Sequence, residues 1–124
     1  MKRLIAAVML AVFVAVIHFT GNIYIKKVIK ECNEQLETIV TDYKKDISPK
    51  ENAEKLQKYW GEKENILSVF VRHDNIDEIE LAIDTLAVYS ETKDSEIFYE
   101  YSGTVKTLLH QLYEDNSFSM HSIL

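Results

Sequence analysis

The feature that most constrains this chain is a stretch without charged side chains near its N-terminus. It runs from Leu4 to Ile25, and its first part, Leu4–Ile17, is wholly apolar. As a helix, these 22 residues would extend about 33 Å, which is enough to cross a hydrocarbon core of about 30 Å. The sequence therefore predicts a transmembrane helix over residues 4–25 and leaves residues 26–124 to form one domain.

Two other interpretations compete with an uncleaved signal anchor. A cleaved signal peptide also begins with basic residues and an apolar run, but small residues then mark its cleavage site. Here Ile17, His18 and Phe19 stand at that position. The buried helix of a soluble protein is the other alternative, but a run this apolar would be an odd core element at the extreme N-terminus. We favour the uncleaved signal anchor.

Basic residues flank the stretch on both sides. Lys2 and Arg3 precede it, whereas Lys26, Lys27 and Lys30 follow it. Basic residues favour the cytoplasmic side, and a very short charged N-terminal tail is typical of a signal anchor. We therefore expect a single-pass protein of the cell membrane whose C-terminal domain lies outside the cytoplasm.

The remainder of the chain is strongly acidic. All 20 acidic side chains follow the apolar stretch, although the chain as a whole has a net charge of only −6. Residues 73–124 contain eleven of them against two basic residues, Lys93 and Lys106. Such a surface repels phosphate backbones, so nucleic acid is not an expected partner. We expect the acidic surface to keep the domain soluble.

Composition and periodicity both indicate helices. Three glycines and one proline are too few for a turn-rich all-β fold. Apolar residues recur instead at spacings of three and four, in four stripes that each suit one helix face. In chain order, the stripes are Ile25, Ile29, Cys32, Leu36, Ile39 and Tyr43; Ala53, Leu56, Trp60, Leu67 and Phe70; Ile76, Ile79, Ile83 and Leu86; and Phe98, Tyr101, Val105, Leu108 and Leu112.

Short turns near residues 47–49, 73–75 and 92–95 imply antiparallel neighbouring helices. We therefore predict an all-α fold in which the N-terminal transmembrane helix continues to about Asp46 as the first helix of an antiparallel up-down bundle. The fourth helix should end near Asp115-Asn116. The tail Phe118–Leu124 is apolar enough to pack back on the bundle.

Local signals predict where the helices begin. Ser48-Pro49-Lys50-Glu51 combines a capping serine, a proline at the first helical position and a glutamate that completes a capping box. Asp74 or Asn75 can cap the third helix, and Asp94 can cap the fourth. Gly61 marks either a close helix contact or a kink.

The sequence contains no recognisable catalytic or metal-binding motif. It has no Gly-x-Ser-x-Gly elbow, no phosphate-binding glycine loop and no Glu-x-x-His or His-x-x-x-His pair. The single cysteine, Cys32, lies on the first apolar stripe and is predicted to be a small buried hydrophobe rather than a reactive thiol. We therefore predict no enzyme activity, no cofactor and no small-molecule substrate, and we assign no catalytic, cofactor-binding or metal-binding residue.

The nearest approach to a ligand cluster is His73 with Asp74 and Asp77. These residues could hold a cation at a helix junction. The alternative is a histidine in the last turn of the second helix, where the helix dipole favours positive charge, followed by a capping acid. We favour the second interpretation. His110 and Glu114, four residues apart, are predicted to form an ordinary surface pair.

Two stretches resemble a known family. Val69–Ile79 (VFVRHDNIDEI) resembles the central block of the bacterial family called domain of unknown function 4363, and Phe118–Leu124 (FSMHSIL) resembles the end of that family. The order of an N-terminal membrane helix, a mid-chain Trp60, the His-acidic block and an apolar end also agrees. The resemblance implies a small membrane protein of endospore-forming and related bacteria, and it implies no activity.

Two functional hypotheses follow. The first is a membrane-anchored interaction or scaffold module, whose partner is another envelope protein or a second copy of the chain. The second is an extracytoplasmic ligand-sensing helical domain. A sensor usually passes its signal to a cytoplasmic output domain, and only three residues precede the apolar stretch. We therefore favour the interaction module.

Overall fold

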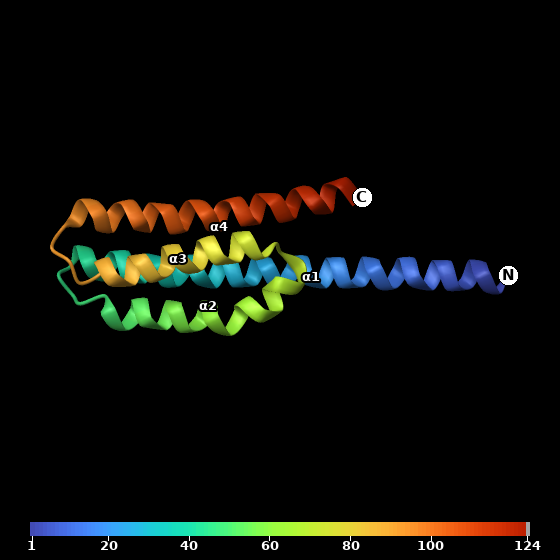
Figure 1. The fold of residues 1–124 in the computed structure, drawn as a ribbon, viewed down its shortest axis with the longest axis horizontal. Helices are drawn as coiled ribbons and strands as arrows, with labels where there is room; N and C mark the ends of the chain where they lie inside the picture. Colours follow the sequence, from blue (N-terminus) through green and yellow to red (C-terminus); the bar gives the residue numbers. More distant parts are fainter. Residues whose placement is uncertain (124) are drawn as a thin grey trace.

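The computed structural model describes the backbone of residues 1–123 and the side chains of residues 1–116. These residues form four helices and no strand: α1 (Lys2–Lys44), α2 (Lys50–Phe70), α3 (His73–Tyr89) and α4 (Ser95–Ile123) (Figure 1). The predicted all-α fold, with a long apolar helix at its N-terminus, is confirmed.

The helices form an up-down bundle in which each one packs against two neighbours. α1 contacts α2 and α4, and α3 contacts the same two helices. Figure 1 shows that the α2–α3 turn lies where α1 leaves the bundle. We call this end, with Gly21 of α1, residues 71–72 and Asn116 of α4, the base of the bundle. The opposite end, with the turns at 45–49 and 90–94, is the far end.

The apolar stripes meet in one core. Its largest fully buried side chains include Trp60 and Phe98, and Cys32 lies among them with no exposed surface. The predicted stripes of α1, α2 and α3 are correct, except that Tyr43 and Phe70 at their ends are only half-buried. On α4 the predicted face is slightly rotated, since Leu109 is fully buried and Tyr101 and Leu108 are half-buried.

α1 ends in a hydrogen-bonded turn that the sequence does not predict. Asp46 adopts a left-handed backbone with φ of 57°. The Ile47 N–H then donates to the Asp42 carbonyl at 2.9 Å, which is the closing bond of a Schellman motif. The helix thus ends at Lys44, close to the predicted Asp46.

Two of the three predicted caps are wrong. α2 begins after Pro49 without a side-chain cap, so Ser48 and Glu51 do not form a capping box. α3 begins after Arg72, also without a side-chain cap, which places the turn before His73 rather than at 73–75. The extended backbone at residues 71–72 ends α2 early and leaves Asp74 and Asn75 inside the first turn of α3.

The cap of α4 is confirmed, but its predicted end is wrong. The Ile97 N–H donates to Asp94 Oδ1 at 3.3 Å. The helix then continues through Asp115-Asn116 to Ile123, and Figure 1 shows it running past the α2–α3 turn beside α1. Polar residues alone do not stop a helix. The predicted packing of the tail Phe118–Leu124 concerns side chains outside the described residues.

The first half of α1 projects from the bundle. Its large apolar side chains from Leu4 to Phe19 are exposed, whereas Gly21, Asn22 and Ile25 are buried. Bundle packing therefore begins at Gly21, five residues before the predicted domain start at residue 26. α1 is long and apolar enough to cross a membrane, a property that a signal sequence shares.

Candidate functional site

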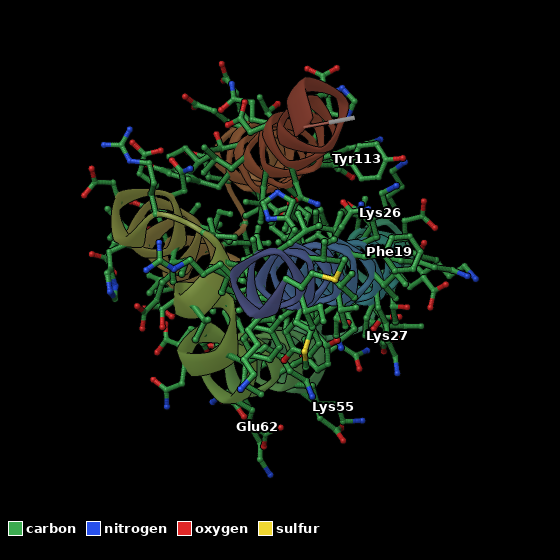
Figure 2. All side chains as sticks on the ribbon, turned by 90° about the vertical axis from the view of Figure 1, so that its right-hand side faces the viewer. Phe19, Lys26, Lys27, Lys55, Glu62 and Tyr113 are labelled. Atoms are coloured by element: carbon green, nitrogen blue, oxygen red, sulfur yellow. The ribbon has the colours of Figure 1, made fainter. Side chains whose placement is uncertain are left out.

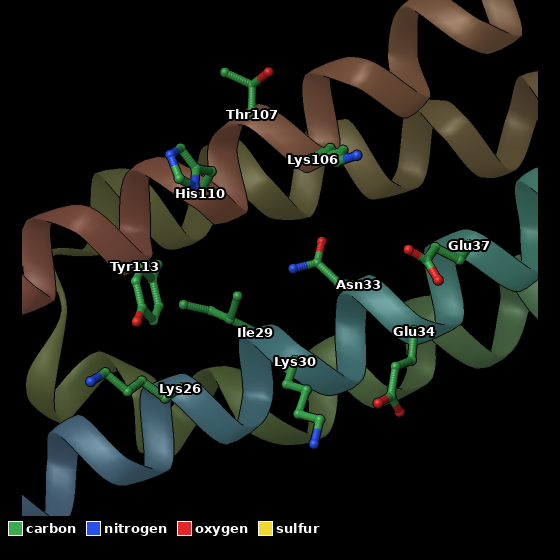
Figure 3. A pocket seen from close by; sticks show the side chains of 10 residues that line it. All are labelled: Lys26, Ile29, Lys30, Asn33, Glu34, Glu37, Lys106, Thr107, His110 and Tyr113. Atoms are coloured by element: carbon green, nitrogen blue, oxygen red, sulfur yellow. The ribbon is translucent and has the colours of Figure 1, made fainter.

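An open groove of about 600 Å³ runs between α1 and α4 (Figure 3). About three helical turns of α1 and about two of α4 contribute to it, since its α1 residues fall between positions 26 and 37 and its α4 residues between 106 and 113. Its lining residues are Lys26, Ile29, Lys30, Asn33, Glu34, Glu37, Lys106, Thr107, His110 and Tyr113.

An aromatic side chain lines the end of the groove that lies nearest the base. Figure 3 shows Tyr113 of α4 and Ile29 of α1 facing each other across the groove, with Lys26 beside them. The Lys26 ammonium lies 5.4 Å from the centroid of the Tyr113 ring, within range of a cation–π interaction. On the outer side, His110 Nε2 lies 3.0 Å from Glu114 Oε1. The predicted surface pair is confirmed.

The groove is open and carries charged side chains of both signs. Lys26, Lys30 and Lys106 share one wide opening with Glu34 and Glu37, so charges of both signs are present. Ligand pockets, by contrast, enclose most of the surface of the ligand that they bind. Among the described contacts, no hydrogen bond in this groove joins a nucleophile to a base.

The structure places His73, Asp74 and Asp77 together on the first turns of α3, and all three are exposed. Arg72 Nη2 lies 3.4 Å from Asp74 Oδ2. The prediction that His73 ends the second helix is wrong, because it is the first residue of α3. The dipole at a helix N-terminus favours negative charge, so the position suits the Asp74 carboxylate and does not provide the dipole interaction predicted for His73.

The described residues contain no group of three or more His, Cys, Asp or Glu side chains that could hold a metal ion. The Cys32 thiol is buried, and burial together with the nearby Glu31 carboxylate raises its pKa to about 12. A thiol with this pKa is almost entirely protonated at neutral pH and is a poor nucleophile. The prediction of a small buried hydrophobe is confirmed.

Side-chain contacts join α1 to α4, or to the turn before α4, at both ends of the bundle. At the base, the Asn116 amide donates to Asn22 Oδ1, and Asn22 is buried. At the far end, the Tyr43 ring stacks on Phe98 with 3.8 Å between ring centroids. The Tyr43 hydroxyl donates to the Thr92 carbonyl at 3.1 Å. Periodicity cannot reveal such pairs, since they join residues far apart in the sequence.

The family model described as domain of unknown function 4363 matches residues 19–123. The chain belongs to this family. The match begins within two residues of Gly21, where bundle packing begins, so the family's shared region corresponds to the bundle. No curated protein and no solved structure is significantly similar to the chain.

One further surface of this family member stands out, on the outer face of α3. Leu81 and Val88 are both exposed, although they are large apolar residues. They lie seven residues apart and therefore on the same side of the helix, with the exposed Asp77 and Asp84 at neighbouring positions of that side. We call these four residues the α3 stripe. The sequence alone could have indicated this surface, because Leu81 and Val88 are large apolar residues that both lie outside the predicted core stripe.

Proposed function

We propose that the protein is a membrane-anchored interaction module of the bacterial cell envelope and that it has no catalytic activity of its own. The observation that carries this proposal is the α3 stripe, in which Leu81 and Val88 remain exposed on a helix that packs, among the described residues, against α2 and α4. Apolar side chains repeated along one free helix face are the pattern that a partner helix buries.

The anchor is the apolar first half of α1. Its large apolar side chains from Leu4 to Phe19 are exposed, and their burial in lipid would be favourable by about 25 cal/mol per Å² of apolar surface. We propose that the protein is a single-pass protein of the cell membrane whose bundle lies outside the cytoplasm. Lys2 and Arg3, which precede the apolar residues, support this orientation.

The two carboxylates of the α3 stripe favour a basic partner over a second copy of the chain. Asp77 and Asp84 flank Leu81, and Asp84 already accepts a hydrogen bond from Gln57 Nε2 at 2.9 Å. Two copies that met through this face would bring carboxylates together, and like charges across an interface are unfavourable. The proposed partner is therefore another envelope protein with a helix that carries apolar and basic side chains.

Site-specific photocrosslinking in living cells tests the proposal. A photoreactive amino acid at Leu81 should give one discrete protein adduct, whereas the same amino acid at Lys55, also exposed but on α2, should not. Val88→Lys should reduce the Leu81 adduct, while the control Ile47→Lys, another exposed apolar residue at the far end, should leave it unchanged. Equal adducts at both positions, or an adduct insensitive to Val88→Lys, would contradict the proposed surface.

The groove between α1 and α4 favours a second candidate function, a ligand-sensing domain. The groove is lined by three lysines, Lys26, Lys30 and Lys106, whose positive charges could hold a small anion. A sensor should show saturable protection of Lys26 and Lys106 from amine-reactive labelling when small carboxylates or phosphates are added. The interaction module requires no such protection.

A further inference from the structure

We propose that the base of the bundle is itself a lipid-contacting surface, so that the domain rests in the headgroup region of the membrane instead of standing clear of it. This inference rests on the proposed membrane anchor. It adds that α2 contributes to membrane contact through the exposed side chains of Ile66 and Val69 at its C-terminal end.

The first argument is length. Only residues 4–20 of α1 lie between the charged N-terminus and the first bundle contact at Gly21. As a helix they extend about 25 Å, which falls about 5 Å short of a hydrocarbon core of about 30 Å. A span that is too short draws its flanking residues towards the bilayer or thins it. The flanking residues here are those of the base.

The second argument is the composition of that base. Ile23 on α1 and Val69 on α2 are exposed by 52% and 74%. Val69 is next to Phe70, whose ring lies against Gly21, so Val69 is at the level where α1 leaves the bundle. These side chains therefore continue the apolar surface of α1 onto the bundle.

The third argument is the position of the positive charges. Lys26 and Lys27 follow Ile23 by three and four residues, or about 5 Å along the helix axis. Figure 2 looks towards the base and shows Phe19, Lys26 and Lys27 projecting from the same side of the molecule. Lysines at this height above an apolar surface reach anionic headgroups while their methylene stems remain near lipid.

Acidic side chains at the base limit how deeply it enters. Asp74 is exposed in the first turn of α3, paired with Arg72 at 3.4 Å, and Asp115 of α4 is also exposed. Carboxylates in hydrocarbon are strongly unfavourable. The base is therefore placed among the headgroups, with Val69 at the edge of the hydrocarbon.

Two valines of nearly equal exposure provide a matched test. Val69 at the base is 74% exposed, and Val88 towards the far end of α3 is 72% exposed. Val69→Cys, Val88→Cys and, within the apolar half of α1, Val14→Cys are each labelled with an environment-sensitive fluorophore in the full chain. The buried Cys32 has no exposed surface to label. The proteins are reconstituted in vesicles of phosphatidylcholine with a minor share of phosphatidylglycerol.

We expect iodide in the water to quench the label at Val88 strongly and the labels at Val14 and Val69 weakly. Lipids with a nitroxide near the headgroup should quench the label at Val69 and not the one at Val88. Iodide quenching at Val69 equal to that at Val88, with Val14 still shielded, would overturn lipid contact while leaving the anchor intact.

Two other outcomes are also decisive. Iodide protection at Val69 without nitroxide quenching would mean that protein, not lipid, covers the base, and would overturn the inference. Exposure of all three positions to iodide would overturn the proposed anchor and the lipid contact with it.

Discussion

Gly21 offers a sharp test of how α1 and α2 pack at the base. A methyl group added at Gly21 would lie 2.6 Å from Cε1 and 2.9 Å from Cγ of the Phe70 ring, and closer still to Cδ1. These separations are far below van der Waals contact, so the half-buried Phe70 ring would have to move. Gly61, also within a helix, has no atom within 4 Å of the same added methyl group.

The two glycines should therefore respond oppositely to alanine. In a helix interior, alanine is favoured over glycine by about 0.8–1.0 kcal/mol, so Gly61→Ala should stabilise the bundle by about 1 kcal/mol. At Gly21 the same gain is opposed by overpacking, which typically costs about 1–3 kcal/mol. Gly21→Ala should then range from neutral to about 2 kcal/mol destabilising.

Thermal unfolding of the full chain in detergent, followed by circular dichroism, measures both effects. For a bundle of this size, 1 kcal/mol corresponds to a Tm change of about 4–8 °C. Phe70→Leu removes the ring, so it should make Gly21→Ala less harmful, with a coupling of about 0.5–3 kcal/mol in a double-mutant cycle. An increase in Tm for Gly21→Ala equal to that for Gly61→Ala would refute the close contact between Gly21 and Phe70.

Three further predictions concern the core, the surface charge and the orientation. Trp60→Ala should lower the free energy of unfolding, measured in urea, by about 3–5 kcal/mol. Trp60→Phe should lower it less, because phenylalanine keeps most of the apolar contact. Equal losses for the two variants would show that the Trp60 ring is not packed in the core. Burial and, after it, the Glu64 carboxylate raise the pKa of Glu80 above its ordinary 4.5, so the folded state binds this proton more tightly than the unfolded state and the free energy of unfolding should fall as the pH rises above 4.5. Glu80→Gln should weaken that pH dependence in parallel urea titrations. If the variant and the original protein showed the same pH dependence, Glu80 would not be its source. A membrane-impermeant thiol reagent should label Lys58→Cys on intact cells, since Lys58 is exposed and Cys32 is buried; labelling only after lysis would place the bundle in the cytoplasm.

The core could be predicted from the sequence because it depends on periodicity within one helix. Trp60, Cys32 and Ile79 each lie on a stripe with spacings of three and four, and each is buried. A helix that must bury one face shows that face in its own sequence, whichever helix covers it.

The helix starts could not be predicted as reliably, since capping signals compete with the local backbone. Ser48 precedes a proline in a favourable pattern, yet α2 begins one residue later than a serine cap requires. His73 was predicted in the wrong helix because residues 71–72 adopt an extended backbone that no single residue type dictates.

The contacts at the base lie beyond periodicity for a different reason. The Gly21–Phe70 contact and the Asn22–Asn116 hydrogen bond each join two helices. A glycine and an asparagine inside an apolar stretch look like interruptions until their partners are known. The α3 stripe could be predicted in part. The sequence shows that Leu81 and Val88 lie outside the core stripe of their helix, but the structure is needed to show that neither α2 nor α4 covers them.

The unbroken course of α1 from Lys2 to Lys44 has a geometric consequence for any partner. Because α1 has no break between its exposed and packed halves, the bundle keeps a fixed orientation relative to the exposed half, and each surface residue lies at a fixed distance along the helix axis from the base. Counting from His73 at the base, Leu81 stands about 12 Å up the bundle and Val88 about 22 Å. If α1 is the proposed membrane anchor, a protein that binds the α3 stripe would have to present its own binding helix at that distance from the base, so the rigid helix would restrict partners by the position of their binding surface as well as by its chemistry.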